Sequence, residues 1–244
     1  MKILIISDIH ANLVAFETVL ADAGEFDHVW CLGDVVGYGP QPNECIEKLR
    51  ALKPLCLAGN HDWAVIEKID LGEFNPDARK ATLWTREQLT PHNLDWLHQL
   101  PERVPTELEK FTLVHGSPRY PIWEYVLGPA IARINFDYFD TPICLMGHTH
   151  VPVLYRFKTE DDIAVPEALA ENTPLILGPD RMMLNPGSVG QPRDGDPRAA
   201  YAMLDTESLT LTSTRIEYDI AATQALMRDA ELPARLVNRL SAGW

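Results

Sequence analysis

Apolar residues in the first part of the chain form short runs that alternate with longer segments of helical spacing. The stretches KILIISD (2–8), DHVWCLGD (27–34) and PLCLAGN (54–60) are short and apolar, which is typical of buried strands. Residues 12–24 and 42–52 lie between them and have helical spacing, the first ending at Gly24, a suitable C-cap. Alternating strands and helices predict a largely parallel sheet with helices on its faces.

The middle of the chain continues with helices and two further strands. Residues 61–100 have a helical pattern with breaks near Pro76 and Pro91. Residues 111–116 (FTLVHG) and 141–147 (TPICLMG) are predicted strands, and residues 128–139 form a predicted helix between them. Beyond residue 151, five strand-like runs follow without helices between them, which predicts a second, mainly antiparallel or mixed sheet.

Two later segments differ from these strands. Residues 158–172 are polar and contain proline, which predicts an exposed excursion, and residues 220–244 predict one or two short helices. No internal repeat, low-complexity tract or linker interrupts the pattern. The chain of 244 residues is long enough to bury a sizeable core, so we expect a single domain over residues 1–244.

The net charge of −14 limits the partners that the chain can bind. Nucleic-acid backbones and anionic membranes are bound by clustered lysine and arginine, so a surface this acidic repels both. We therefore expect no long nucleic acid as a partner. A small phosphate ester remains a suitable substrate if the site itself is locally positive.

The composition also predicts where the protein resides. No apolar run approaches the ~20 residues that cross a bilayer. The opening MKILIISD meets an aspartate at once, unlike a secretory signal. We therefore expect a cytoplasmic protein with no membrane partner. The four cysteines form no C-x-x-C pair, which predicts core packing for Cys31, Cys45, Cys56 and Cys144.

Polar residues follow five of the predicted strands, at the point where each strand ends. In open α/β sheets ligands bind beyond the carboxyl ends of the strands, and parallel neighbours bring these ends to one edge. Glycines beside them let the backbone turn sharply and leave room for a bound group. The residues are Ser7, Asp8 and His10 after the first strand, then Asp34, then Asn60, His61 and Asp62, then His115, and finally His148 and His150.

Each of these residues has an ordinary structural explanation when it is taken alone. A single aspartate or asparagine after a strand commonly caps a helix or forms a turn, and a single histidine there is more often a satisfied polar residue. The set is harder to explain in this way, because five of the eight histidines fall at these strand ends. His28, His92 and His98 do not, and we predict that they are surface residues.

The chemistry of the set indicates a metal centre. Aspartate, asparagine and histidine without thiolates suit divalent Mn, Fe, Ni, Co or Zn. A closed structural site uses four ligands, which would leave several of these residues over. Two ions that share a bridging carboxylate would use them all. We therefore predict two divalent ions, with manganese as the first choice and with His148 and His150 divided between them.

The order of the motifs resembles that of the calcineurin-like metallophosphoesterase superfamily. SDIHAN, GDVVGYG, GNHD, VHGS and GHTH occur in the family's order, and NPGSVGQPRDGDPRAAYAMLD resembles its compact bacterial and archaeal phosphodiesterase branch. The match covers roughly residues 1–205 and departs at Ala11, where many members have glycine. The resemblance implies an α/β fold of four layers, α-β-β-α, with two mixed sheets packed face to face and flanking helices.

The resemblance also implies a role for each matching residue. The implied enzyme is a phosphoesterase in which two metal ions clamp the phosphate of a small ester and a bridging hydroxide attacks phosphorus. Phosphodiesters are implied more strongly than monoesters. Asp8, His10 and His150 would hold one ion, Asn60, His115 and His148 the other, with Asp34 bridging both, His61 acting as the acid near the substrate and Asp62 orienting it.

Other functions remain open on the sequence alone. The acidic surface counts against a nuclease. A protein phosphatase or a dinucleoside-polyphosphate hydrolase stays possible, because the motifs specify the metals and not the leaving group. A non-catalytic interaction scaffold of the same fold could lose ligands without harm, yet here every ligand position and His61 are present. The oligomeric state is not specified by any feature of the sequence.

Three further features have both a functional and a structural explanation. NPGSVG (185–190) is a tight loop that could bind a ligand or could only shape the site. Arg119 and Arg193 could each pair with a substrate phosphate or could be ordinary surface residues. Tyr38, Trp63, Tyr120 and Trp123 could line a pocket for a nucleoside or aryl group, or could pack against the core.

Overall fold

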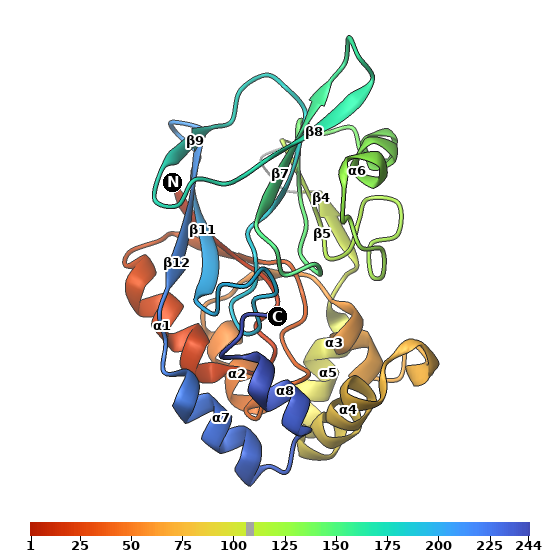
Figure 1. Cartoon of the computed structure of the whole chain (residues 1–244), viewed down its shortest axis with the longest axis vertical. Helices are drawn as coiled ribbons and strands as arrows, with labels where there is room; N and C mark the ends of the chain where they lie inside the picture. Colours follow the sequence, from red (N-terminus) through yellow and green to blue (C-terminus); the bar gives the residue numbers. More distant parts are fainter. Residues whose placement is uncertain (106–109) are drawn as a thin grey trace.

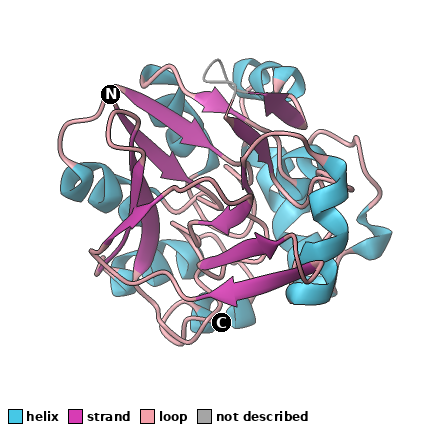
Figure 2. Cartoon of the chain, turned by 90° about the horizontal axis from the view of Figure 1, so that it is seen from above, coloured by secondary structure: helices cyan, strands magenta, loops and turns pink. Residues whose placement is uncertain are grey.

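The computed structural model describes residues 1–105 and 110–244. It contains two mixed β-sheets stacked face to face, with helices outside them (Figures 1 and 2). Figure 2 shows the strands in the middle of the molecule and the helices around them. This arrangement confirms the four-layer α/β sandwich. In the described residues no helix is both long and apolar enough to span a bilayer.

The first sheet contains six described strands, of which the three from the start of the chain are parallel. Its β1 strand also pairs with a late strand in the antiparallel direction, with Ile3 opposite Leu204. The strand order is β3 (Leu55–Cys56), β2 (His28–Cys31), β1 (Lys2–Ile6), β11 (Ala199–Asp205), β12 (Thr210–Ile216) and β9 (Pro174–Ile176).

The second sheet also contains six described strands and is likewise mixed. Strands β5, β6 and β10 are parallel to one another, and antiparallel strands continue the sheet on both sides. The strand order is β4 (Arg103–Pro105), β5 (Phe111–Val114), β6 (Ile143–Leu145), β10 (Met182–Asn185), β7 (Val153–Lys158) and β8 (Ile163–Glu167).

The sheets do not divide the chain into halves, which corrects the expectation of a separate second sheet beyond residue 151. Strands β9, β11 and β12 extend the first sheet, while β7, β8 and β10 extend the second. The polar strand ends therefore come from two sheets and not from one edge of a single sheet. The physical reason is that either sheet offers an open edge for pairing, and local sequence does not select between them.

The core follows the alternation of side chains along the strands. Ile3 and Ile5 of β1 join an apolar cluster between the two sheets, together with Leu113 of β5. Leu4 and Ile6 point the other way and pack with Phe16 of an outer helix. The outer face of the second sheet forms a further cluster that includes residues of β6, β7 and β10. Three apolar layers thus hold the four layers of the sandwich together.

The helices begin where the sequence provides a cap or a proline. The predicted breaks near Pro76 and Pro91 are present, and each proline begins a new helix, in whose first turn its missing N–H is not needed. The helices are α1 (Leu13–Ala23), α2 (Pro42–Ala51), α3 (Asn60–Val65), α4 (Pro76–Gln88), α5 (Pro91–Gln99), α6 (Pro129–Asn135), α7 (Ile220–Asp229) and α8 (Ala234–Arg239), with 3-10 turns η1 (Leu71–Glu73) and η2 (Phe136–Tyr138).

The sequence made separate predictions for residues 158–172 and for the end of the chain. The polar excursion at residues 158–172 contains strand β8, which pairs with β7 and projects beyond the sandwich (Figure 1). One or two short helices are predicted at the end of the chain, and the structure has two, α7 and α8. Met227 and Leu236 of these helices pack with Ala64 of α3 and Ala78 of α4. The final helices therefore cover the side of the molecule on which the polar strand ends lie.

Candidate metal centre

The backbone at the strand ends adopts a conformation that non-glycine residues rarely use. Asp8 and His10 after β1 have φ of 54° and 49°, and Asp34 after β2 has 53°. His148 and His150 after β6 have 64° and 61°. Aspartate and histidine tolerate this left-handed region better than branched residues, and such strain gathers at functional sites. These turns direct the side chains toward one another between the two sheets.

One group of four buried side chains lies beyond the end of β1. The Nε2 atoms of His10 and His150 are 3.1 Å apart. Asp8 Oδ1 is 3.2 Å from His150 Nε2, and Asp34 Oδ2 is 3.6 Å from His10 Nε2. The four residues offer ligand atoms that all lie within 4.8 Å of one another. That spacing suits a single divalent ion.

Asp34 also belongs to a second group, with His115 and His148. Its Oδ2 atom is 3.4 Å from His115 Nε2. The same Nε2 atom is 3.1 Å from His148 Nδ1 and 3.2 Å from Asn60 Oδ1. Every ligand predicted from the sequence therefore lies in one of two adjoining groups, and Asp34 is common to both.

The other nitrogen of each histidine ring faces a backbone carbonyl. His115 Nδ1 lies 2.9 Å from Leu32 O, and His148 Nε2 lies 3.2 Å from Trp123 O. A carbonyl oxygen can only accept, so the ring nitrogen beside it carries the hydrogen. The same holds for His10 Nδ1 beside Val36 O and His150 Nδ1 beside Gln191 O.

In a neutral ring, the other nitrogen, which faces the cluster, therefore carries no hydrogen and presents a lone pair. Lone pairs of His10 and His150 then point at each other, and Asp8 Oδ1 is buried beside them without a hydrogen-bond partner. Such a set is unfavourable by itself, because buried acceptors need a donor or a cation. A divalent ion satisfies all of them, and histidine ligands are held in this way by carbonyls in metal sites. The residues therefore fit a metal.

The electrostatics of the cluster agree with that conclusion. Burial alone would raise the pKa of Asp8, but His150 and His115 outweigh it and hold that pKa well below its usual range. Burial lowers the pKa of His148 well below its ordinary value. Burial would also lower the pKa of His115, yet Asp34 raises it to about 9. The carboxylates thus favour positive charge here, which a bound cation would supply.

Gly59 provides the space in which Asp34 lies. A Cβ atom on residue 59 would stand 2.1 Å from Asp34 Oδ1 and 2.5 Å from the backbone nitrogen of Asp34. Both distances are far below van der Waals contact. The glycine before Asn60 is therefore required by the close approach of the loop that carries the shared carboxylate.

His61 and Asp62 follow Asn60 at the start of α3. The backbone N–H of His61 donates to Asp34 Oδ1 at 2.8 Å, and the ring Nδ1 of His61 is buried without a partner. The Asp62 carboxylate accepts from the backbone N–H groups of Gly59, Val35 and Val36, at 2.9, 3.3 and 3.1 Å. Asp62 therefore contacts backbone and not the ring of His61. The implied role of Asp62 in orienting His61 stays a prediction.

Aromatic rings surround the cluster. The ring of Tyr38 lies 4.2 Å from that of His61, and Phe74 lies 5.0 Å from His61 on another side. Trp123 lies 5.3 Å from Phe74 and is 37% exposed. Tyr125 stacks on His148 at 3.8 Å and is 41% exposed. The sequence pointed to Tyr38 and Trp123, while Phe74 and Tyr125 carry no local signal of their position.

The remaining sequence candidates are also placed. Trp63 is partly buried against the core, and Tyr120 is 58% exposed. Loop 185–190 braces the metal loops, because Ser188 Oγ donates to Asp8 O at 2.9 Å and Asn185 Nδ2 donates to Gly147 O at 2.6 Å. The carbonyl of Gln191, which receives the His150 ring, could not be found from residue types because every residue has a carbonyl.

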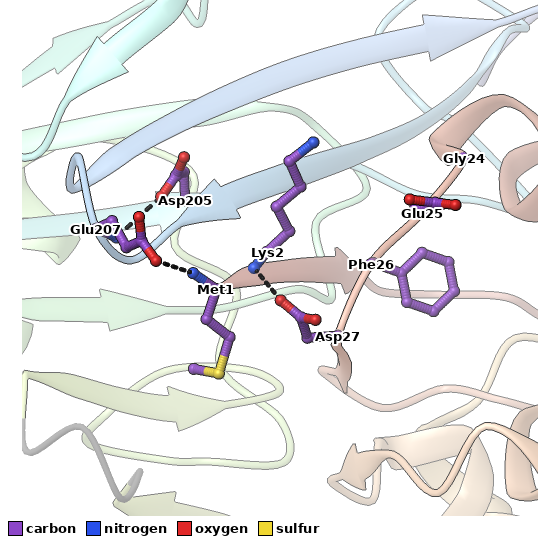
Figure 3. Close-up of a pocket in the computed structure, with 8 residues that line it drawn as sticks. All are labelled: Met1, Lys2, Gly24, Glu25, Phe26, Asp27, Asp205 and Glu207. Atoms are coloured by element: carbon purple, nitrogen blue, oxygen red, sulfur yellow. Dashed lines mark hydrogen bonds and ion pairs between the residues drawn. The ribbon is translucent and has the colours of Figure 1, made fainter.

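A cavity of about 600 Å³ lies at the opposite end of β1 and is lined by none of these side chains. Figure 3 shows carboxylates around the first residues of the chain. Glu207 pairs with the amino group of Met1 at 3.4 Å, and Asp27 accepts from the backbone N–H of Lys2 at 2.8 Å. Asp205 accepts from the backbone N–H of Glu207 at 2.9 Å. Three of its four acids are thus engaged within the chain, and the cavity has no donor set comparable with the cluster.

Known proteins resemble this chain over nearly all of its length. The family model of the calcineurin-like phosphoesterase superfamily domain matches residues 1–209. A crystal structure of a metallophosphoesterase from Sphaerobacter thermophilus is 52% identical, covers 100% of this chain and 99% of that one, and superposes with a TM-score of 0.91. An uncharacterized protein of Methanocaldococcus jannaschii is 36% identical, covering 99% and 98%. The phosphodiesterase YfcE of Escherichia coli K12 is 27% identical, covering 91% and 96%.

Proposed function

Because the chain belongs to the calcineurin-like phosphoesterase superfamily, we propose that one domain over residues 1–244 hydrolyses small phosphodiesters with two divalent metal ions. The family makes the chain a metal-dependent phosphoesterase. The number of ions, the class of ester and the roles of individual residues are our proposal. One observation carries it, which is that Asp34 is shared between two adjoining groups of potential ligands.

The proposed ligand sets follow from the geometry of those groups. Asn60 stands beside His115 and so belongs with the second set. Oxygen and imidazole donors of this kind suit manganese, which we propose as the first ion to test, with Fe, Ni, Co or Zn as alternatives. Asp8, His10 and His150 would hold one ion, His115, His148 and Asn60 the other, and Asp34 both.

When bound, two such ions neutralise the charge of a phosphate and make water available as a nucleophile near neutral pH. The remaining parts of the reaction depend on residues of the chain itself. Asp34 fixes the start of α3 through the backbone N–H of His61, which places the His61 ring between Tyr38 and Phe74. We assign to His61 the proton that passes to the leaving oxygen as the bond to phosphorus breaks.

The aromatic surface favours esters that carry an organic group on each side of the phosphate. Phe74 and Trp123 adjoin His61 in a row, so the leaving group of a bound ester would lie against them. A monoester has one such group. A diester has a second, which can pack against the exposed ring of Tyr125. The phosphodiesterase name of the Escherichia coli relative supports the same choice.

The proposed setting is a cytoplasmic enzyme without nucleic-acid partners. All four cysteines are free thiols, as is usual in a reducing compartment. The net charge of −14 opposes binding of long DNA or RNA.

Hydrolysis of bis-p-nitrophenyl phosphate with added Mn²⁺ tests the proposal. We expect turnover that depends on metal and falls by orders of magnitude in His61→Ala. His92→Ala is the matched control, because His92 is an exposed histidine on α5. A wild-type protein that holds its metal and yet turns over no ester would instead favour the interaction scaffold.

A further inference from the structure

Arg193 lies on the loop that also orients a proposed metal ligand. Its backbone N–H donates to His150 O at 3.4 Å. Its Nη2 atom donates to Gln191 Oε1 at 3.0 Å, and the carbonyl of Gln191 receives the ring of His150. The position of the Arg193 side chain is therefore tied to the metal cluster by two adjacent contacts.

The guanidinium of Arg193 has no carboxylate partner among the described residues, although acids are its neighbours in the chain. Asp194 pairs with Arg215, and Asp196 pairs with Arg198 at 2.7 Å. The Nε atom of Arg193 is buried and has no hydrogen-bond partner. Gln191 and Tyr125 are its partners within the chain, and neither of them carries a negative charge. A buried donor on a charged group is costly to leave unsatisfied, so the Nε atom has room for an acceptor from a ligand.

Arg119, the other arginine singled out by the sequence, differs in this respect. Its guanidinium pairs with Glu124, and that carboxylate is held in addition by Ser117 at 2.7 Å and Asn135 at 2.8 Å. The side chain of Arg119 is therefore occupied by an internal ion pair. The structure separates two arginines that the sequence could not distinguish.

Arg193 faces the same space as the residues proposed to carry the chemistry. Its Cζ atom is 5.7 Å from the centre of the Tyr38 ring. That ring lies 4.6 Å from His10 and 4.2 Å from His61. The guanidinium is thus close to the metal cluster and to His61 together.

We propose that Arg193 binds the non-bridging oxygens of the substrate phosphate, between the metal cluster and the ring of Tyr38. The inference rests on the proposed function and adds a substrate-binding residue to it. A guanidinium presents several N–H donors in a planar fork that matches two phosphate oxygens. The unsatisfied Nε and the unpaired charge of Arg193 supply that fork.

The test compares Arg193→Met with Arg193→Lys and with the control Arg133→Met. Arg133 of α6 is a suitable control because its guanidinium already has an internal partner, Asp137, at 3.0 Å. The measurements are kcat and KM for bis-p-nitrophenyl phosphate, the inhibition constant of inorganic phosphate, and the metal content of each protein. Each assay is run at limiting and at saturating Mn²⁺, because Arg193 also adjoins His150.

We expect Arg193→Met to weaken inhibition by phosphate and to raise KM on the order of tenfold to a hundredfold, as for loss of a charge-assisted hydrogen bond. Arg193→Lys should retain part of the binding, since its charge remains while the fork is lost. Metal content should equal that of the wild type. Arg133→Met should leave phosphate inhibition unchanged.

Unchanged phosphate inhibition in Arg193→Met at saturating Mn²⁺ would overturn the proposal. A weakening that disappears once Mn²⁺ is saturating would also overturn it, and would assign Arg193 to holding His150 in place. If the wild type hydrolyses no ester, the proposed function fails by itself. Titration of inorganic phosphate into the metal-loaded proteins by calorimetry then still decides whether Arg193 binds phosphate.

Discussion

The carboxylate of Asp62 accepts a hydrogen bond from the backbone N–H of Val36 at 3.1 Å and forms none with Nδ1 of its neighbour His61. Two further backbone N–H groups, those of Gly59 and Val35, donate to the same carboxylate. Asp62 therefore joins the loop after β2 to the loop after β3. These are the loops that carry Asp34 and Asn60, so the proposed metal centre depends on this buried link.

Replacing Asp62 with alanine should destabilise the fold. Three buried N–H groups lose their acceptor, which we expect to cost about 3 kcal/mol or more in the free energy of unfolding. Asp70→Ala is the control, since Asp70 accepts a single backbone bond, from Gly72 at 2.8 Å at an exposed turn, and should cost about 1 kcal/mol. Urea unfolding measures both. Equal losses of unfolding free energy in the two variants would show that the three hydrogen bonds of Asp62 stabilise the fold no more than the single one of Asp70.

Replacing His61 with asparagine should lower kcat for bis-p-nitrophenyl phosphate by about 10²–10⁴-fold, the usual contribution of a proton donor. The metal content should remain that of the wild type, because His61 lies outside both groups of potential ligands. Steady-state kinetics and elemental analysis give the two readouts. Loss of metal together with activity would mean that His61 serves the metal centre and not the leaving group.

The metal stoichiometry should report on the two ligand groups separately. We expect two Mn²⁺ per chain in the wild type and about one in either His115→Ala or His10→Ala, because each variant removes a ligand from one group only. Elemental analysis after gel filtration provides the count. A single ion in the wild type would contradict the dinuclear proposal directly.

Gly59→Ala should prevent metal binding through a steric effect. The added Cβ would stand 2.1 Å from Asp34 Oδ1, so the shared carboxylate would have to move. Gly178→Ala is the matched control, because a Cβ there meets nothing within 4 Å. Calorimetric titration with Mn²⁺ should show strong weakening in the first variant and wild-type binding in the second. Full binding by Gly59→Ala would indicate that the loops adapt to the extra atom.

The hydrogen bond from Tyr201 to Asp22, at 2.8 Å, predicts a pH dependence of stability. Burial, and after it Asp22, raises the pKa of Tyr201 to about 12. The stabilisation is therefore complete below the ordinary pKa of about 10 and is lost as pH rises through about 12. We expect Tyr201→Phe to be less stable than the wild type by about 1 kcal/mol at pH 8, since Asp22 is exposed.

That difference should shrink as the pH approaches 12. Urea unfolding of both proteins at several pH values measures it, with Tyr138→Phe as a control at a half-exposed tyrosine. A stability difference that stays constant up to pH 12 would show that this hydrogen bond is not its cause.

The sequence by itself determined which residues could form the centre. Each apolar run that ends in Asp8, Asp34, Asn60, His115 or His148 has the length of a buried strand, and strand ends must turn. Polar residues with glycine beside them at such turns are a local signal. The order of the motifs carried the family resemblance, which the family model confirmed over residues 1–209.

Only the tertiary structure decided how these ends meet. Strand β11 pairs with β1 across about two hundred residues, and local sequence cannot specify such a partner because backbone hydrogen bonds are the same for every residue type. For the same reason the sequence could not identify the carbonyls of Leu32 and Gln191, which orient His115 and His150. Backbone groups carry no identity in the sequence, so their role becomes visible only when the chain is folded.

Two arginines show that the ion-pair partners of side chains are likewise decided by the tertiary structure and not by the local sequence. Arg119 and Arg193 look alike in the sequence, since both stand beside proline and glycine near predicted strand ends. Arg119 finds Glu124 as an ion-pair partner, while the acids that follow Arg193 are taken by Arg215 and Arg198. Which charge is left for a ligand depends on which partners come within reach, and long-range packing decides that.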